Sequence, residues 1–151
     1  MTEILAVDEM LRKLQGFDPL RRVLLATPGT LQGTLSAYFG RQVDIRMSSQ
    51  GLNGSTIERV VDLVLRDEGT VVCHAESRVV VDDEDFLKLV LEKRIGLGRI
   101  AQLLHRETSF LLETARQNAE SFTRSYRLAG EGFAFHIDEE FPSILYPEAR
   151  S

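Results

Sequence analysis

The stretch IERVVDLVLRDEGTVVCHAESRVVVD, residues 57–82, contains two alternating apolar segments around a short polar turn. Residues 57–66 and 70–82 each place apolar side chains at every second position, which is the period of a β-strand. Asp67-Glu68-Gly69 lies between them, and a short turn that ends in glycine is typical of a β-hairpin. The stretch therefore predicts two antiparallel strands joined tightly.

Two charged residues fall on the apolar faces of predicted strands. Arg59 shares a face with Val61 and Leu63, and Glu139 shares a face with the phenylalanines of the stretch FAFHIDEEF, residues 133–141. Successive side chains of a strand point to opposite faces, so both charges are predicted to point toward the core. A buried charge is costly unless it is paired or binds a ligand. Each charge therefore indicates a structural ion pair, a strand end that reaches water, or a polar ligand site.

The rest of the chain adds helices on both sides of this hairpin. A single domain over residues 1–151 is expected. We predict helices at residues 3–15, 30–39, 82–94 and 99–120, strands at 43–47, 122–128 and 133–141, and a mobile loop at 48–55. The order of the predicted elements is helices, three strands, two helices and two strands, with short turns. This order predicts an α+β fold with an antiparallel sheet covered by helices.

Composition excludes several classes of protein. The net charge of −5 argues against a nucleic-acid surface. The single cysteine, Cys73, permits neither an internal disulfide nor a cysteine-based zinc site, and it is predicted to be a small core residue. No apolar run approaches the roughly 20 residues of a membrane-spanning helix. The acidic N-terminal stretch does not resemble a signal peptide, so a cytoplasmic protein with no membrane partner is expected.

Other motifs carry weaker signals. The three histidines, His74, His105 and His136, have no metal-ligand spacing, and no nucleotide-binding or nucleophile motif is present, so no metal and no cofactor are expected. The break Gly96-Leu97-Gly98 indicates a helix corner, or backbone N–H groups that bind an anion at the start of the next helix. Arg78 lies on the polar face of the second hairpin strand and is a further candidate because of its place in the hairpin.

The order of short motifs resembles the chorismate pyruvate-lyase family, most closely its actinobacterial-type branch. The matching pieces occur in the family's order and span most of the chain: Leu24-Leu25 followed by GTL at 29–31, RVVDLVL at 59–65, AES at 75–77, GLGRI at 96–100, RSYRL at 124–128 and DEEFPSILY at 138–146. The resemblance implies an antiparallel sheet with helices packed on one side and a buried ligand pocket. It also implies cofactor-free conversion of chorismate to 4-hydroxybenzoate and pyruvate by a monomer or homodimer.

The resemblance also implies site residues. Carried over by position, Arg59 would bind the ring carboxylate, and Glu139 would face the 4-oxygen substituent. Leu31 and Leu97 would offer backbone groups to the substrate, and Gly98 would let the chain approach it closely. Where better-studied enterobacterial-type lyases carry a second arginine on the middle strand, this chain has Glu76. The candidates to replace that arginine are Arg78, Arg127 and Arg46.

Three other functions stay open at this point. The same pocket chemistry would suit a lyase that acts on 4-amino-4-deoxychorismate or one that yields 3-hydroxybenzoate. The fold type also resembles effector domains that bind small aromatic acids without catalysis. An inactive interaction protein is the third possibility, and it would not bind small aromatic acids.

Overall fold

The computed structural model describes residues 2–28, 31–92 and 97–148, and its central feature is one six-stranded sheet. The strand order is β1-β2-β3-β6-β5-β4, and every neighbouring pair is antiparallel. The strands are β1 (Val43–Asn53), β2 (Thr56–Leu65), β3 (Val71–Val81), β4 (Ser109–Gln117), β5 (Ser121–Gly130) and β6 (Phe133–Pro142). The predicted α+β class is confirmed.

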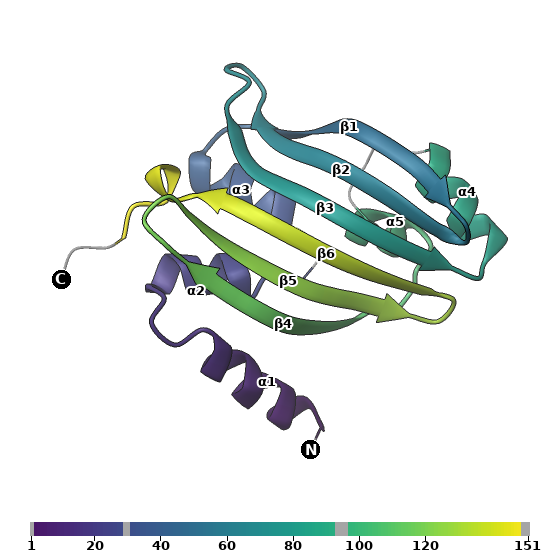
Figure 1. The fold of residues 1–151 in the computed structure, drawn as a ribbon, viewed down its shortest axis with the longest axis horizontal. Coiled ribbons are helices and arrows are strands. Elements are labelled where there is room, and N and C mark those ends of the chain that lie inside the picture. The colour runs from purple at the N-terminus through teal and green to yellow at the C-terminus, as the bar shows by residue number, and fades with distance from the viewer. Residues whose placement is uncertain (1, 29–30, 93–96, 149–151) are drawn as a thin grey trace.

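The described helices leave one face of the sheet open. Figure 1 shows α2, α3 and α5 behind the sheet, and none of the described helices crosses its front. We call the helix-covered side the inner face and the open side the outer face. The helices are α1 (Thr2–Lys13), α2 (Pro19–Leu25), α3 (Leu31–Phe39), α4 (Glu84–Glu92) and α5 (Leu97–Leu103), and a 3-10 turn covers Ser143–Leu145.

Alternation of side chains along the strands decides which residues enter the core. In β6 the inner-face residues Phe133, Phe135, Ile137, Glu139 and Phe141 are all buried, whereas the residues that alternate with them are partly or fully exposed. The predicted hairpin is confirmed as β2 and β3, in which Arg59 lies opposite Ser77. Residues 57–82 therefore form two neighbouring interior strands of the sheet, paired as the predicted hairpin.

The predicted long helix over residues 99–120 is wrong. Helix α5 ends at Leu103, and His105 takes a left-handed conformation with φ of 54° that turns the chain away. The chain then forms β4, in which a bulge lies between Leu112 and Thr114. The bulge interrupts the two-residue period of the strand, and the segment is rich in residues that favour helices. The sequence pattern of residues 99–120 therefore favoured a helix. Pairing with β5 overrides that local preference.

The predicted mobile loop over residues 48–55 is also wrong for most of its length. Strand β1 continues to Asn53, which pairs with Thr56 across a tight turn. A bulge between Met47 and Ser49 shifts the register, and the Ser48 hydroxyl donates a hydrogen bond to the Val60 carbonyl oxygen at 3.1 Å. Polar residues are tolerated here because β1 is an edge strand, and its backbone pairing with β2 holds the segment.

We expect Gly130→Ala to destabilise the fold. A Cβ at Gly130 would collide with the Glu107 carbonyl oxygen and would lie 2.6 Å from the Phe133 ring. Overpacking of this kind costs about 1–3 kcal/mol, which thermal denaturation would detect as a lower melting temperature. Gly51→Ala is the matched control, because a Cβ at Gly51 meets nothing within 4 Å. Equal melting temperatures for the two variants would contradict this packing.

Candidate functional site

An ion pair is buried on the inner face where β5 and β6 meet. Arg124 and Glu139 lie directly opposite each other in the strand register, and both side chains point under the helices. The Arg124 Nε atom lies 2.6 Å from Glu139 Oε1. Arg124 is 1% exposed and Glu139 is 6% exposed, so water does not screen the pair. The alternative of a solvated position for Glu139 is therefore excluded.

Tyr126 joins this pair from the next inner-face position of β5. Its hydroxyl donates a hydrogen bond to Glu139 Oε2 at 3.3 Å, and the Arg124 guanidinium lies 4.1 Å from the centre of its ring. Burial raises the pKa of the Tyr126 hydroxyl, and the nearby Glu139 carboxylate raises it further. Burial lowers the pKa of Arg124, but the charge and hydrogen bond of Glu139, together with the nearby Tyr126 and Cys73, raise it above its ordinary value.

Arg124 also anchors the end of helix α2 to the sheet. Its Nη1 atom donates to the carbonyl oxygens of Leu25 at 2.9 Å and Thr27 at 2.8 Å, which lie at and beyond the helix C-terminus. Its Nη2 atom is also buried, but it has no hydrogen-bond partner among the described residues. A buried donor without a partner is unfavourable. Arg124 therefore has a donor available for an acceptor on a ligand.

Arg59 enters the same face from β2. It is 3% exposed, and burial lowers its pKa to about 10. The two inner arginines therefore differ in electrostatic environment, because contacts with Glu139 and Tyr126 together raise the Arg124 pKa against the effect of burial, whereas burial lowers the Arg59 pKa.

Small side chains separate Arg59 from the ion pair. Ser77 lies opposite Arg59, and Ala75 lies opposite Glu139, so β3 contributes only two short, buried side chains between them. Ideal strand spacing and rise place the Cα atoms of Arg59 and Glu139 roughly 12 Å apart. The two groups therefore do not neutralise each other directly, and short side chains lie along the line between them.

The remaining predicted site residues divide between the two faces. Leu31 and Leu97 are buried at the first positions of α3 and α5, and Gly98 follows in the first turn of α5. Residues 95 and 96 of the predicted glycine break lie outside the described residues. Arg78 is exposed on the outer face of β3. Arg59 lies on the inner face, so Arg78 does not share a face with the buried cluster.

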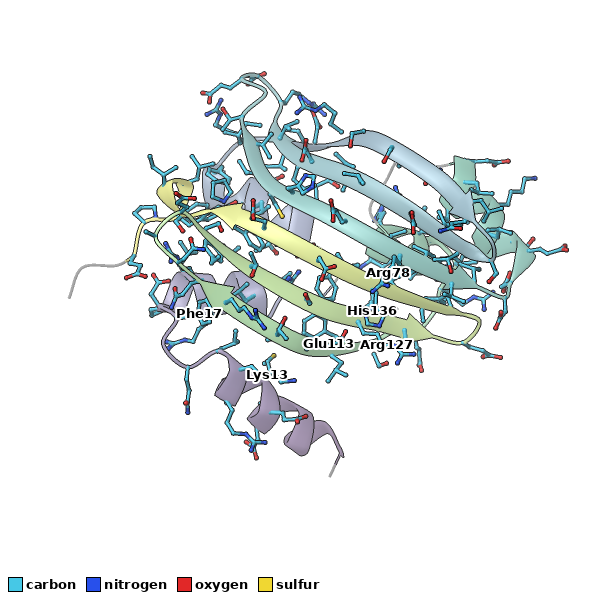
Figure 2. All side chains as sticks on the ribbon, viewed as in Figure 1. Lys13, Phe17, Arg78, Glu113, Arg127 and His136 are labelled. Atoms are coloured by element: carbon cyan, nitrogen blue, oxygen red, sulfur yellow. The ribbon has the colours of Figure 1, made fainter. Side chains whose placement is uncertain are left out.

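None of the proposed replacements for the second arginine reaches the inner face. Arg127 and Arg46 are exposed, and Figure 2 shows Arg78 and Arg127 on the front of the sheet together with His136 and Glu113. The inner face instead holds Arg124, which the sequence analysis missed. Its signal was present in the stretch FTRSYRL, residues 122–128, where it alternates in phase with Phe122 and Tyr126 as Arg59 does in β2.

Some kinds of site find no support in the described part of the chain. No group of three or more His, Cys, Asp or Glu residues is arranged there to hold a metal ion. None of the helices in the same residues has the length and apolar character needed to cross a membrane. Burial raises the pKa of the Cys73 thiol, which keeps it protonated and unreactive.

Fold and site together define an α+β protein with an arginine–carboxylate cluster buried between its sheet and its helices. A comparison of the sequence with models of known protein families finds no match, and a comparison with curated proteins finds none either.

Proposed function

We propose that this protein is a lyase that converts chorismate to 4-hydroxybenzoate and pyruvate. One observation carries the proposal: two guanidinium groups and one carboxylate are buried on the same sheet face, with only short side chains between them. Chorismate carries two carboxylates and a hydroxyl group on a small ring. Two guanidinium groups and a carboxylate on one buried face match such a substrate in charge and in hydrogen-bonding groups, and buried ionisable clusters of this kind are typical of functional sites.

The residues can be assigned to parts of the substrate. Arg59 binds the ring carboxylate, because a guanidinium fork matches a carboxylate in shape and charge. Glu139 accepts a hydrogen bond from the oxygen at ring position 4. The free Nη2 donor of Arg124 binds the carboxylate of the enolpyruvyl group. Following the resemblance, Leu31 and Leu97 offer backbone groups to the ring, and Gly98 lets the chain come close.

The reaction is an elimination that needs little covalent help. The ether bond to the enolpyruvyl group breaks, one ring hydrogen leaves as a proton, and the released enolpyruvate takes up a proton to become pyruvate. Aromatisation of the ring supplies the driving force. The protein holds the dianion in one reactive conformation, an effect worth up to roughly 7–11 kcal/mol in ideal cases. Exclusion of water strengthens each charged contact.

We expect purified protein incubated with chorismate to release pyruvate and 4-hydroxybenzoate in equal amounts. Pyruvate would be measured with a coupled lactate dehydrogenase assay and the aromatic acid by chromatography, with heat-denatured protein as the control. Release of 3-hydroxybenzoate, or turnover of 4-amino-4-deoxychorismate alone, would replace the proposed product or substrate with a related one. Tight binding of 4-hydroxybenzoate without any pyruvate release would identify a sensing domain and refute the lyase.

A further inference from the structure

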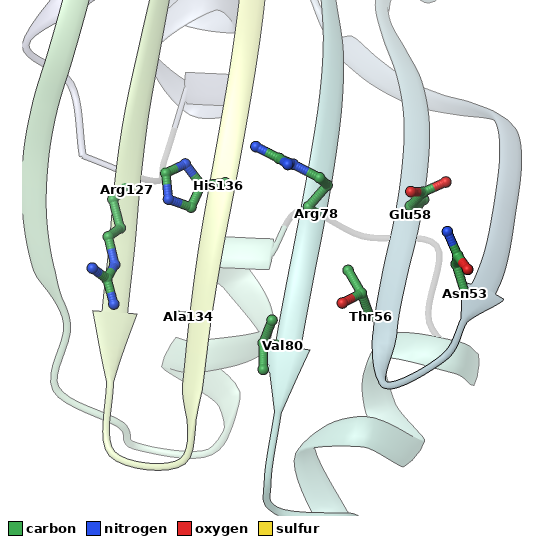
Figure 3. Close-up of a pocket in the computed structure, with 8 residues that line it drawn as sticks. All are labelled: Asn53, Thr56, Glu58, Arg78, Val80, Arg127, Ala134 and His136. Carbon is green, nitrogen blue, oxygen red and sulfur yellow. The ribbon is translucent and has the colours of Figure 1, made fainter.

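A second polar region lies on the outer face, on the opposite side of the sheet from the buried cluster. A groove of about 650 Å³ crosses this face, and Figure 3 shows the side chains that line it. Its volume falls within the range of small-molecule sites. Its basic groups come from Arg78, His136 and Arg127, its other polar groups from Glu58 and Asn53, and its apolar or methyl surface from Val80, Ala134 and Thr56.

The three basic residues form one row across neighbouring strands. Arg78 on β3 lies directly opposite His136 on β6, and His136 lies directly opposite Arg127 on β5. The two arginines therefore lie on either side of His136 on one face of the sheet. The strand register brings two guanidinium groups close to one place in a protein whose net charge is −5.

The acidic side chains nearby leave most of this charge uncompensated. Glu58 lies directly opposite Arg78 in the register, but Figure 3 shows the Arg78 guanidinium turned away from it and toward His136. Within the described residues, neither Arg78 nor Arg127 makes an ion pair or a hydrogen bond. His136 alone is near a carboxylate, with its Nδ1 atom 3.2 Å from Glu113 Oε1.

Other arginines near this sheet face are paired. Arg46 lies 3.5 Å from Asp62, and Arg66 lies 2.8 Å from Asp44. The absence of such contacts at the groove is therefore a local property of the groove. Two unpaired guanidinium groups on either side of an imidazole form a donor set that favours a multiply charged anion.

We propose that this groove binds a small organic phosphate. Its phosphate group lies between Arg78 and Arg127 and beside His136, and its apolar part lies on Val80, Ala134 and the methyl group of Thr56. Ideal strand spacing separates the two arginine Cα atoms by roughly 10 Å, a span that two long side chains close around one phosphate. The acidic Glu58 and Glu113 at the sides limit the site to a small ligand and disfavour an extended polyanion.

Phenyl phosphate is the probe that tests this site, by isothermal titration calorimetry at low ionic strength. We expect saturable binding, weakened at least about tenfold by either Arg78→Gln or Arg127→Gln, because each variant removes a charge-assisted contact. Arg46→Gln is the matched control, since it removes one charge from an exposed, paired arginine on β1 and should change affinity less than twofold. Circular dichroism checks that each variant is folded.

Three outcomes would overturn the proposal. The first is no saturable binding of phenyl phosphate at millimolar concentration. The second is an equal loss of affinity in Arg46→Gln, which would indicate general charge attraction. The third is equal affinity for phenyl phosphate and inorganic phosphate, which would remove the role of the apolar surface. Arg59→Ala should leave phenyl phosphate binding unchanged, because Arg59 lies on the other face, so this site and the lyase can fail independently.

Discussion

Arg59→Ala should lower the turnover of chorismate at least about 30-fold, because loss of one partner of a buried charge contact costs roughly 2–5 kcal/mol, or about 30- to 5,000-fold in rate. The substrate carboxylate would then enter the interior without its cation. Pyruvate release under saturating and limiting chorismate would measure the loss in kcat and in kcat/KM. Arg46→Ala is the control, since it removes an exposed arginine from the neighbouring strand and should leave turnover unchanged.

The stability of a second variant, Arg59→Met, separates a functional role of Arg59 from a structural one. Because burial lowers the pKa of Arg59 to about 10, desolvation of its charged guanidinium costs the folded state roughly 3 kcal/mol at neutral pH. That cost is fully present below about pH 10 and disappears as the pH rises through the higher pKa of the unfolded chain. Methionine carries no charge to desolvate, so we expect Arg59→Met to stay folded under the assay conditions, while turnover falls as in Arg59→Ala.

Either of two results would refute this assignment of Arg59. One is production of 4-hydroxybenzoate by Arg59→Ala at the normal rate. The other is a large loss of stability in Arg59→Met together with the loss of turnover, because that would make Arg59 a structural residue and the loss of activity a consequence of unfolding.

Glu139→Leu should destabilise the protein by about 3–5 kcal/mol, because it leaves the Arg124 guanidinium buried without its carboxylate. The effect is large because the two charges lie 2.6 Å apart and both are almost fully buried. Urea-induced unfolding at neutral pH would measure it. The double variant Arg124→Met/Glu139→Leu should recover part of the loss, because an apolar pair carries no uncompensated charge, whereas the Leu25 and Thr27 carbonyl oxygens lose the Arg124 donor.

The exposed pair of Arg66 and Asp44 provides the comparison for this experiment. Its atoms lie 2.8 Å apart, but the Arg66 side chain is exposed and the Asp44 side chain is partly exposed, so Asp44→Ala should lower the free energy of unfolding far less than Glu139→Leu. If Glu139→Leu costs as little as Asp44→Ala, the buried ion pair is not formed. If the double variant is as unstable as Glu139→Leu alone, the loss reflects packing and the charge argument fails.

The central strands were predictable because their pattern is local and strict. In the strands of residues 57–82 and 133–141 every second side chain faces the core, and all of these are apolar except Arg59, Ser77 and Glu139. The same reasoning predicted that Arg59 and Glu139 point inward. The edge strands were not predictable in this way, because bulges at Ser48 and Glu113 break the alternation and edge positions tolerate polar residues.

The amino-acid sequence by itself determined which side chains of each central strand enter the core, because that depends only on the two-residue period of a strand. The tertiary structure alone decided which charges meet. The pairing of β5 with β6 places Arg124 against Glu139, and the separation of β2 from β6 by β3 keeps Arg59 apart from both. Contacts between strands depend on register and strand order, which bring together residues that are distant in the chain and that no local pattern can align.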